Sequence, residues 1–190
     1  MASKKVRIIY RKVRRPIEWF LIGLAQLIIP PLSLGALLRL AHWIADTAYL
    51  FDRRGKAIAA ANLRVMFGAR MTPTRERALI RRSYRNMARV MVNVFWMSRD
   101  TLNRIRDQVS FEPSVLEALR AHQPAITVSA HLGNWEILSQ AVVASGIPIM
   151  SVAKLIGSPE MTAQLTAMRS TIGQQIVPAD GALRRLMYAL

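Results

Sequence analysis

Cysteine is absent from this 190-residue sequence. Disulfide bonds, thiolate nucleophiles and zinc or iron–sulfur sites built on cysteine are therefore excluded. Acidic residues are also scarce, because 11 aspartates and glutamates stand against 27 lysines and arginines, for a formal net charge of +16. Such a surplus indicates an anionic partner, whether lipid, nucleic acid or an acidic protein, and carries no information about the fold.

Three common sequence signatures are missing as well. The sequence has no GxxxxGK phosphate loop, no GxGxxG dinucleotide fingerprint and no GxSxG nucleophile elbow. What it does have is length and apolar content: 190 residues, 52% of them hydrophobic, suffice for one ordinary domain with a sizeable core.

The N-terminal region joins a basic start to a long uncharged run. Residues 1–15 hold seven basic side chains and no acid, and Trp19–Leu38 carries no charge. Pro30-Pro31 splits the run, and proline inside a helix costs about 3 kcal/mol or more. We therefore expect two helices, residues 17–29 and 34–50, that insert in one leaflet with both ends on the cytoplasmic side. The alternative is a buried core helix.

A basic helix follows this segment. Thr72-Pro73 is typical of a helix start, and the pattern predicts a helix to about residue 97 with arginines 81, 85 and 89 along one face. Such a face suits an anionic membrane surface or an acidic carrier protein, and it is also compatible with an ordinary solvated face. The chain shows neither zinc-finger spacing nor an RNP-type aromatic motif, so nucleic acid is not the expected partner.

The second half of the chain alternates between strand and helix patterns. The expected strands are 109–112, 125–129, 148–153 and 175–177, and the expected helices are 114–121, 134–145, 158–171 and one from 180 to the C-terminus. This alternation predicts the α/β class, with a mainly parallel sheet flanked by helices. Ligands of such sheets bind beyond the carboxyl ends of the strands, and His131 follows the second expected strand.

The hexapeptide His131-Leu132-Gly133-Asn134-Trp135-Glu136 holds a base and an acid across a strand-to-helix turn. Histidine is the natural general base near neutral pH, and a carboxylate such as Glu136 can hold its second ring nitrogen. Gly133 permits close approach, and the backbone N–H groups after Asn134 can bind a developing negative charge. The residues predict direct attack by a hydroxyl that His131 deprotonates. On spacing alone, a structural histidine remains the alternative.

This hexapeptide closely resembles the H-x-G-N-W-E motif of the bacterial lipid A biosynthesis (lauroyl/myristoyl) acyltransferases, within the lysophospholipid acyltransferase superfamily. A second stretch, residues 169–176 followed by 180–183, resembles that family's arginine–glycine block and the helix after it. The resemblance implies a glycerolipid-acyltransferase-like fold, with residues 1–56 as a membrane-anchoring segment and 57–190 as the N-terminal part of the acyltransferase domain. Because family members are longer, it also implies a C-terminally truncated chain and an incomplete sheet.

By resemblance, His131 is the catalytic base, Glu136 its partner, and Gly133, Asn134, Lys154 and Arg169 bind substrate. The implied reaction moves a fatty acyl chain from acyl carrier protein or coenzyme A to a hydroxyl of a lipid A precursor, at the cytoplasmic face of the inner membrane. No metal and no bound cofactor is implied.

Two alternatives stay open. The first is a lysophospholipid or glycolipid acyltransferase that uses the same pair of residues. The second is a basic protein without catalysis that binds a membrane surface or nucleic acid.

Overall fold

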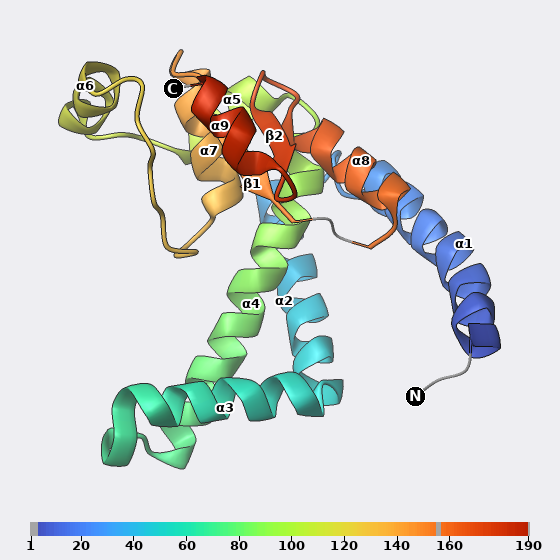
Figure 1. Ribbon diagram of the computed structural model, residues 1–190. Coiled ribbons are helices and arrows are strands. Elements are labelled where there is room, and N and C mark those ends of the chain that lie inside the picture. The colour runs from blue at the N-terminus through green and yellow to red at the C-terminus, as the bar shows by residue number, and fades with distance from the viewer. Residues whose placement is uncertain (1–3, 155–156, 190) are drawn as a thin grey trace. The chain divides into compact units, whose positions relative to one another are not determined.

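The computed structural model describes the backbone of residues 4–154 and 157–189, and side chains from residue 16 onward (Figure 1). The described chain is mostly helical and contains one two-stranded parallel sheet. In chain order the elements are α1 (Lys4–Ile28), α2 (Leu34–Phe51), α3 (Arg53–Phe67), the short 3₁₀ helix η1 (Gly68–Arg70), α4 (Pro73–Met97), α5 (Thr101–Gln108), α6 (Pro113–Ala121), α7 (Trp135–Ala144), β1 (Met150–Ala153), α8 (Pro159–Arg169), β2 (Gln175–Pro178) and α9 (Ala182–Ala189).

The chain forms two compact units. The first comprises the described residues up to Pro31 and those from Val94 onward, and the second comprises residues 32–93. We refer to them as the sheet unit and the helical unit. The predicted division of the chain at residue 56 stays a prediction.

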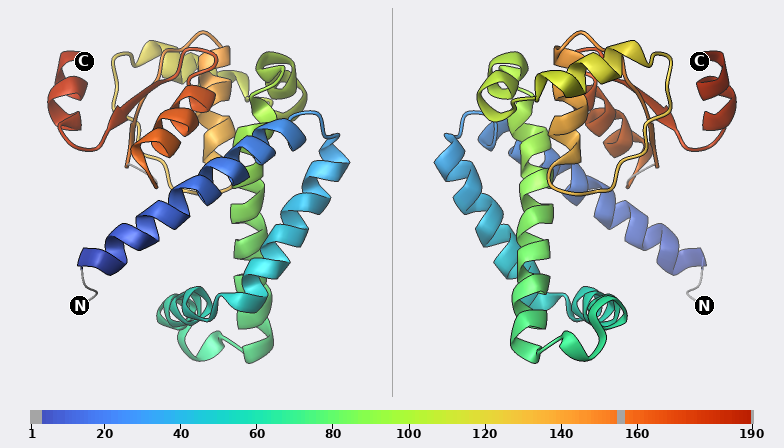
Figure 2. Two further views of the ribbon diagram at one scale, coloured as in Figure 1. Left: turned by 90° about the vertical axis from the view of Figure 1, so that its right-hand side faces the viewer. Right: turned by 90° about the vertical axis from the view of Figure 1, so that its left-hand side faces the viewer.

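The sheet unit contains a parallel β–α–β element. β1 pairs with β2 from Met150 opposite Gln175 to Ala153 opposite Pro178, and α8 connects the two strands. Ser158 begins α8, because its side chain accepts a hydrogen bond from the Met161 backbone N–H. Figure 2 shows α8 beside both the sheet and α1, and the Gln26 side chain of α1 donates to Met168 Sδ of α8 at 3.9 Å.

α1 ends just before Pro30-Pro31, as the sequence predicts. The chain after it is fixed by Arg104 of α5, whose Nη2 donates to the Pro30 carbonyl oxygen at 2.7 Å. The same guanidinium also donates to the Trp96 carbonyl oxygen and lies 4.0 Å from the centre of the Trp96 ring. Burial, followed by repulsion from Arg99, lowers the pKa of Arg104.

In the helical unit, α2 and α4 each bury small and branched side chains, which we call the apolar seam. Leu37, Ala41 and Ala45 recur every four residues on α2 and are buried, and α4 contributes Ile80 and Ala88 among its buried residues. This is the spacing expected of one helix face in a core. Ser33 begins α2 by accepting from the Ala36 N–H, so the start of the second expected helix is confirmed.

Polar contacts join α2 to α4 outside this apolar seam. Arg81 and Arg85 each bind the Asp46 carboxylate through two hydrogen bonds of 2.8–3.1 Å. These bonds hold the pKa of Asp46 well below its usual range. Two of the three arginines predicted as one exposed stripe are thus engaged inside the unit.

Two expected strands are not formed. Residues 109–112 and 125–129 have no strand pairing in the described structure, and Val128 is 95% exposed. The reason is that β-branched composition measures only how well side chains suit a pleated surface, whereas a strand also requires a neighbouring backbone. The predicted mainly parallel sheet of the α/β class is therefore limited to β1 and β2.

Among the helices that the structure describes, none combines the length and apolar content needed to cross a bilayer. The predicted insertion of residues 17–50 in one leaflet stays a prediction.

Candidate active site

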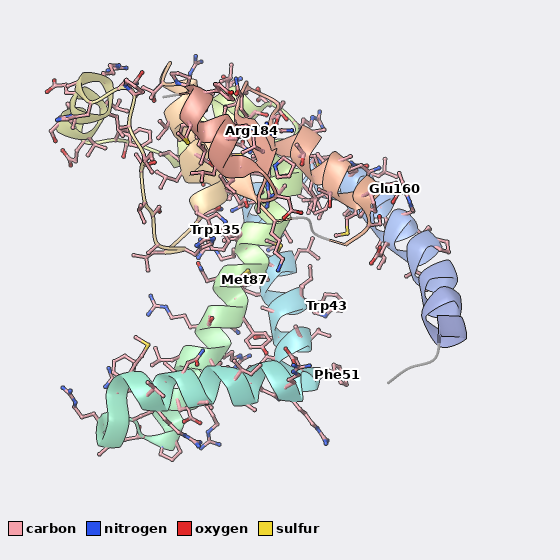
Figure 3. The ribbon with its side chains drawn as sticks, viewed as in Figure 1. Trp43, Phe51, Met87, Trp135, Glu160 and Arg184 are labelled. Atoms are coloured by element: carbon pink, nitrogen blue, oxygen red, sulfur yellow. The ribbon has the colours of Figure 1, made fainter. Side chains whose placement is uncertain are left out.

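The candidate site is built around the first turn of α7, in the sheet unit (Figure 3). Asn134 begins this helix, because its side-chain Oδ1 accepts from the Ile137 backbone N–H at 3.2 Å. Gly133 directly before it has φ +65°, a backbone conformation that favours glycine over any residue with a Cβ. The predicted start of a helix at Asn134 is thus confirmed.

Glu136 is buried on the inner face of α7 and is held from two sides. Its Oε1 accepts from Arg169 Nη2 at 2.6 Å and from Trp135 Nε1 at 3.2 Å. The Glu136 and Arg169 side chains are only 10% and 11% exposed. A buried carboxylate and a buried guanidinium stabilise each other, since either alone would be an uncompensated charge. Residues 33 positions apart in the chain therefore form one ion pair.

His131 lies in the exposed loop before α7. Its ring centre is 4.6 Å from that of Trp135, and the two ring planes are inclined by 58°. In the described structure His131 forms no hydrogen bond with Glu136, whose carboxylate is engaged by Arg169 and Trp135. The indole of Trp135 thus contacts both members of the predicted pair: its N–H donates to Glu136, and its ring packs beside His131.

Lys154 and Arg169 line one small pocket of about 110 Å³. The pocket lies at the carboxyl ends of both strands, because Ala153 and Pro178, the last residues of β1 and β2, also line it. This is where open α/β sheets bind ligands. Arg169 Nε is buried and has no hydrogen-bond partner among the described residues. The structure therefore brings two of the predicted substrate-binding cations to a strand-end pocket.

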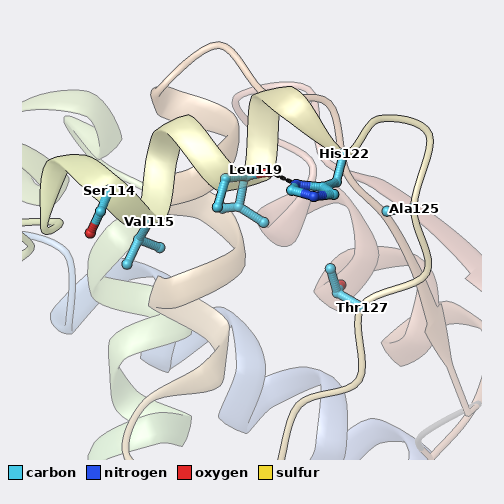
Figure 4. Close-up of a pocket in the computed structure, with 7 residues that line it drawn as sticks. Ser114, Val115, Leu119, His122, Ala125 and Thr127 are labelled. Carbon is cyan, nitrogen blue, oxygen red and sulfur yellow. Dashed lines mark hydrogen bonds between the residues drawn. The ribbon is translucent and has the colours of Figure 1, made fainter.

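A larger hollow of about 370 Å³ lies elsewhere in the sheet unit (Figure 4). It is lined by side chains of α6, by His122 and by Ala125 and Thr127 of the exposed segment, and it contains none of the predicted site residues. Its polar lining side chains are Ser114, His122 and Thr127.

Two residues of this region were not singled out from the sequence. Trp135 lies between His131 and Glu136 in the sequence, and this position could have indicated that its ring contacts both residues. Gln140 is one turn after Glu136 on the same buried face, and its Oε1 has no partner among the described residues. Nothing in the sequence around Gln140, a glutamine within an apolar helix pattern, indicates that it is buried beside the site.

The described residues contain no group of three or more histidines and carboxylates that could hold a metal ion. Three contacts link the site residues: the His131 ring lies beside Trp135, the Trp135 indole donates to Glu136, and Glu136 pairs with Arg169. Lys154 lines the same pocket as Arg169.

Comparison with known proteins gives one positive finding. No curated protein and no solved structure matches the chain. A family model described as bacterial lipid A biosynthesis acyltransferase matches residues 4–190, which is nearly the whole sequence. This chain therefore belongs to the bacterial lipid A biosynthesis acyltransferase family.

Proposed function

We propose that this protein transfers a fatty acyl chain from an acyl thioester to a hydroxyl of a lipid A precursor, with His131 as general base. Family membership indicates an acyltransferase of lipid A biosynthesis in general. The observation that supports the specific mechanism is the connection of the histidine–glutamate motif to a buried arginine at the carboxyl ends of the strands. That arrangement links the base, through Trp135 and Glu136, to an arginine that lines a cationic pocket.

The reaction can be written with these groups. His131 takes the proton of the acceptor hydroxyl while the hydroxyl oxygen attacks the thioester carbonyl carbon. Backbone N–H groups in the first turn of α7 stabilise the developing oxyanion. The C–S bond then breaks, and the leaving thiolate takes the proton back from the imidazolium of His131. General-base catalysis of this kind contributes about 10²- to 10⁴-fold.

Glu136 is proposed to orient and stabilise the His131 imidazole. In the structure its carboxylate is fixed by Arg169 and by the Trp135 indole, and the indole ring contacts His131. Catalytic hydrogen bonds are often long or misaligned until substrate is bound. His131 lies in an exposed loop, so substrate binding can bring its ring nitrogen to the carboxylate.

Lys154 and Arg169 are proposed to bind an anionic group of the substrates. A guanidinium and an ammonium across a pocket of about 110 Å³ suit a phosphate of the lipid acceptor or of the donor. The proposed donor is acyl carrier protein or acyl coenzyme A. The proposed location is the cytoplasmic face of the inner membrane, with residues 1–56 as the anchor.

The test uses the full chain and three variants. We expect His131→Ala and Glu136→Ala to lower transfer of labelled acyl groups to a lipid A precursor by at least about 10²-fold, while membrane association persists. His122→Ala is the matched control, because it removes an exposed histidine of the same unit that lies outside the site. Unchanged turnover in both site variants would contradict the mechanism. Transfer to lysophospholipid in place of the lipid A precursor would favour the related acyltransferase activity.

A further inference from the structure

Helix α3 of the helical unit turns large apolar side chains outward. Ile58, Val65 and Met66 are 52%, 87% and 71% exposed. Ile58 and Val65 are seven residues apart and so lie on the same side of the helix, with Met66 next to them. Within the described chain α3 buries none of its residues. We call these three side chains the α3 strip.

The inner side of α3 is held by specific contacts, so its orientation is defined. Asp52 begins the helix by accepting from the Gly55 N–H at 2.7 Å, and the same carboxylate accepts from the Tyr84 hydroxyl of α4 at 2.8 Å. At the other end, Arg64 binds Glu76 of α4 at 2.9 Å. The polar residues at both ends of α3 are thus engaged, whereas the α3 strip remains exposed.

The surroundings of the α3 strip are strongly cationic. Residues 32–93 contain twelve lysines and arginines and three acids, a net charge of +9. Each of the three acids is engaged within the unit: Asp46 by two arginines, Asp52 by Gly55 and Tyr84, and Glu76 by Arg64. Arg53, Arg54 and Arg70, on or directly after α3, are exposed. Arg54, four residues before Ile58, lies on the same side of α3 as the strip, and the exposed cations at both ends of the helix are available to an external anionic partner.

We propose that the α3 strip docks on the surface of an anionic lipid bilayer, as a contact separate from the basic N-terminal segment. An interfacial helix buries its apolar side chains at the level of the headgroups, and arginines beside them reach the phosphates. Each cation near an anionic surface adds to the binding. An acidic protein would satisfy the arginines but would not require outward-facing Ile58, Val65 and Met66. The proposal is independent of acyl transfer.

The absence of cysteine allows a direct test on the full chain. Val65→Cys is labelled with an environment-sensitive fluorophore, and Glu117→Cys on the exposed side of α6 serves as the matched control. Vesicles of phosphatidylcholine with and without phosphatidylglycerol are added. We expect a blue shift at position 65 with the anionic vesicles, quenching by shallow lipid-attached quenchers, and neither response at position 117.

A double variant tests how much the strip contributes to vesicle binding. Ile58→Ser combined with Val65→Ser should weaken binding to anionic vesicles by about tenfold or more, because two apolar side chains leave the interface. Both positions are exposed, so far-UV circular dichroism should be unchanged. An unshifted label at position 65 while the chain is vesicle-bound overturns the proposal. So does a response at position 65 to an acidic carrier protein with none to vesicles.

Discussion

The ion pair between Glu136 and Arg169 supports the sharpest stability prediction. Arg169→Met removes the guanidinium and leaves a carboxylate that is 90% buried with one remaining donor, the Trp135 indole at 3.2 Å. Breaking a buried pair from one side typically costs about 3–5 kcal/mol. Because the indole still donates, we expect the lower end, about 3 kcal/mol. That is a large part of the roughly 5–15 kcal/mol that stabilises a typical domain.

Removing both charges should lower the free energy of unfolding less than removing the Arg169 charge alone. In Glu136→Gln with Arg169→Met no buried charge remains, and the glutamine oxygen can still accept from the indole of Trp135. We therefore expect the double variant to recover about 1–2 kcal/mol relative to Arg169→Met alone. The measurement is the free energy of unfolding from denaturant titrations of the full chain, of Arg169→Met and of the double variant.

An exposed pair in the same chain provides the control. Arg64 binds Glu76 at 2.9 Å, but its side chain is 69% exposed, so Arg64→Met should cost at most about 1 kcal/mol. If Arg64→Met and Arg169→Met lowered the free energy of unfolding equally, burial of the ion pair would not explain the size of the loss. A double variant no more stable than Arg169→Met would refute the argument from an uncompensated charge.

Three further changes test the helical unit. Leu37→Ala deletes a fully buried side chain from the apolar seam and should lower the free energy of unfolding by about 2–5 kcal/mol, measured by denaturant titration. Gly55→Ala places a methyl group against Asp52 Oδ2 and the Tyr84 hydroxyl oxygen, so the hydrogen bond between them should break. Burial first, and then this hydrogen bond, raises the pKa of Tyr84, so an ultraviolet titration should show the part of the rise that depends on Asp52 disappear. The Asp46 carboxyl has a depressed pKa in the folded chain, so its contribution is present above the unfolded pKa of about 3.9 and is lost as the pH falls below it. Thermal unfolding of Asp46→Asn should accordingly lose the part of the acid sensitivity between pH 5 and 2 that the parent shows.

Several helix starts were predictable from the sequence because they depend on local contacts, whereas α3, α5 and the start of α1 at Lys4 were not predicted. Ser33, Asn134 and Ser158 each begin a helix by accepting a backbone N–H three residues later, and Thr72 does the same for α4. Such contacts need only neighbouring residues, so hydroxyl or amide side chains before an apolar pattern predict them. α6 begins at Pro113, one residue before the expected start.

The strands were only partly predictable from the sequence. Residues 148–153 and 175–177 were expected as strands, and β1 and β2 form there and pair with each other. Residues 125–129, with the same β-branched character, remain unpaired. A helix closes its hydrogen bonds within one segment, but a strand depends on another segment of the chain. Composition therefore could not distinguish the paired strands from the unpaired segment.

For the site, the sequence alone singled out the residues that we propose carry the chemistry: the motif from His131 to Glu136 and, by family resemblance, the basic residues Lys154 and Arg169. It also determined the start of α7, through the cap at Asn134. Only the tertiary structure decided that Glu136 is buried against Arg169, that Trp135 joins His131 to that carboxylate, and that Lys154 shares a pocket with the arginine. The physical reason is that a motif specifies neighbours along the chain, whereas burial and ion pairing depend on how distant segments pack.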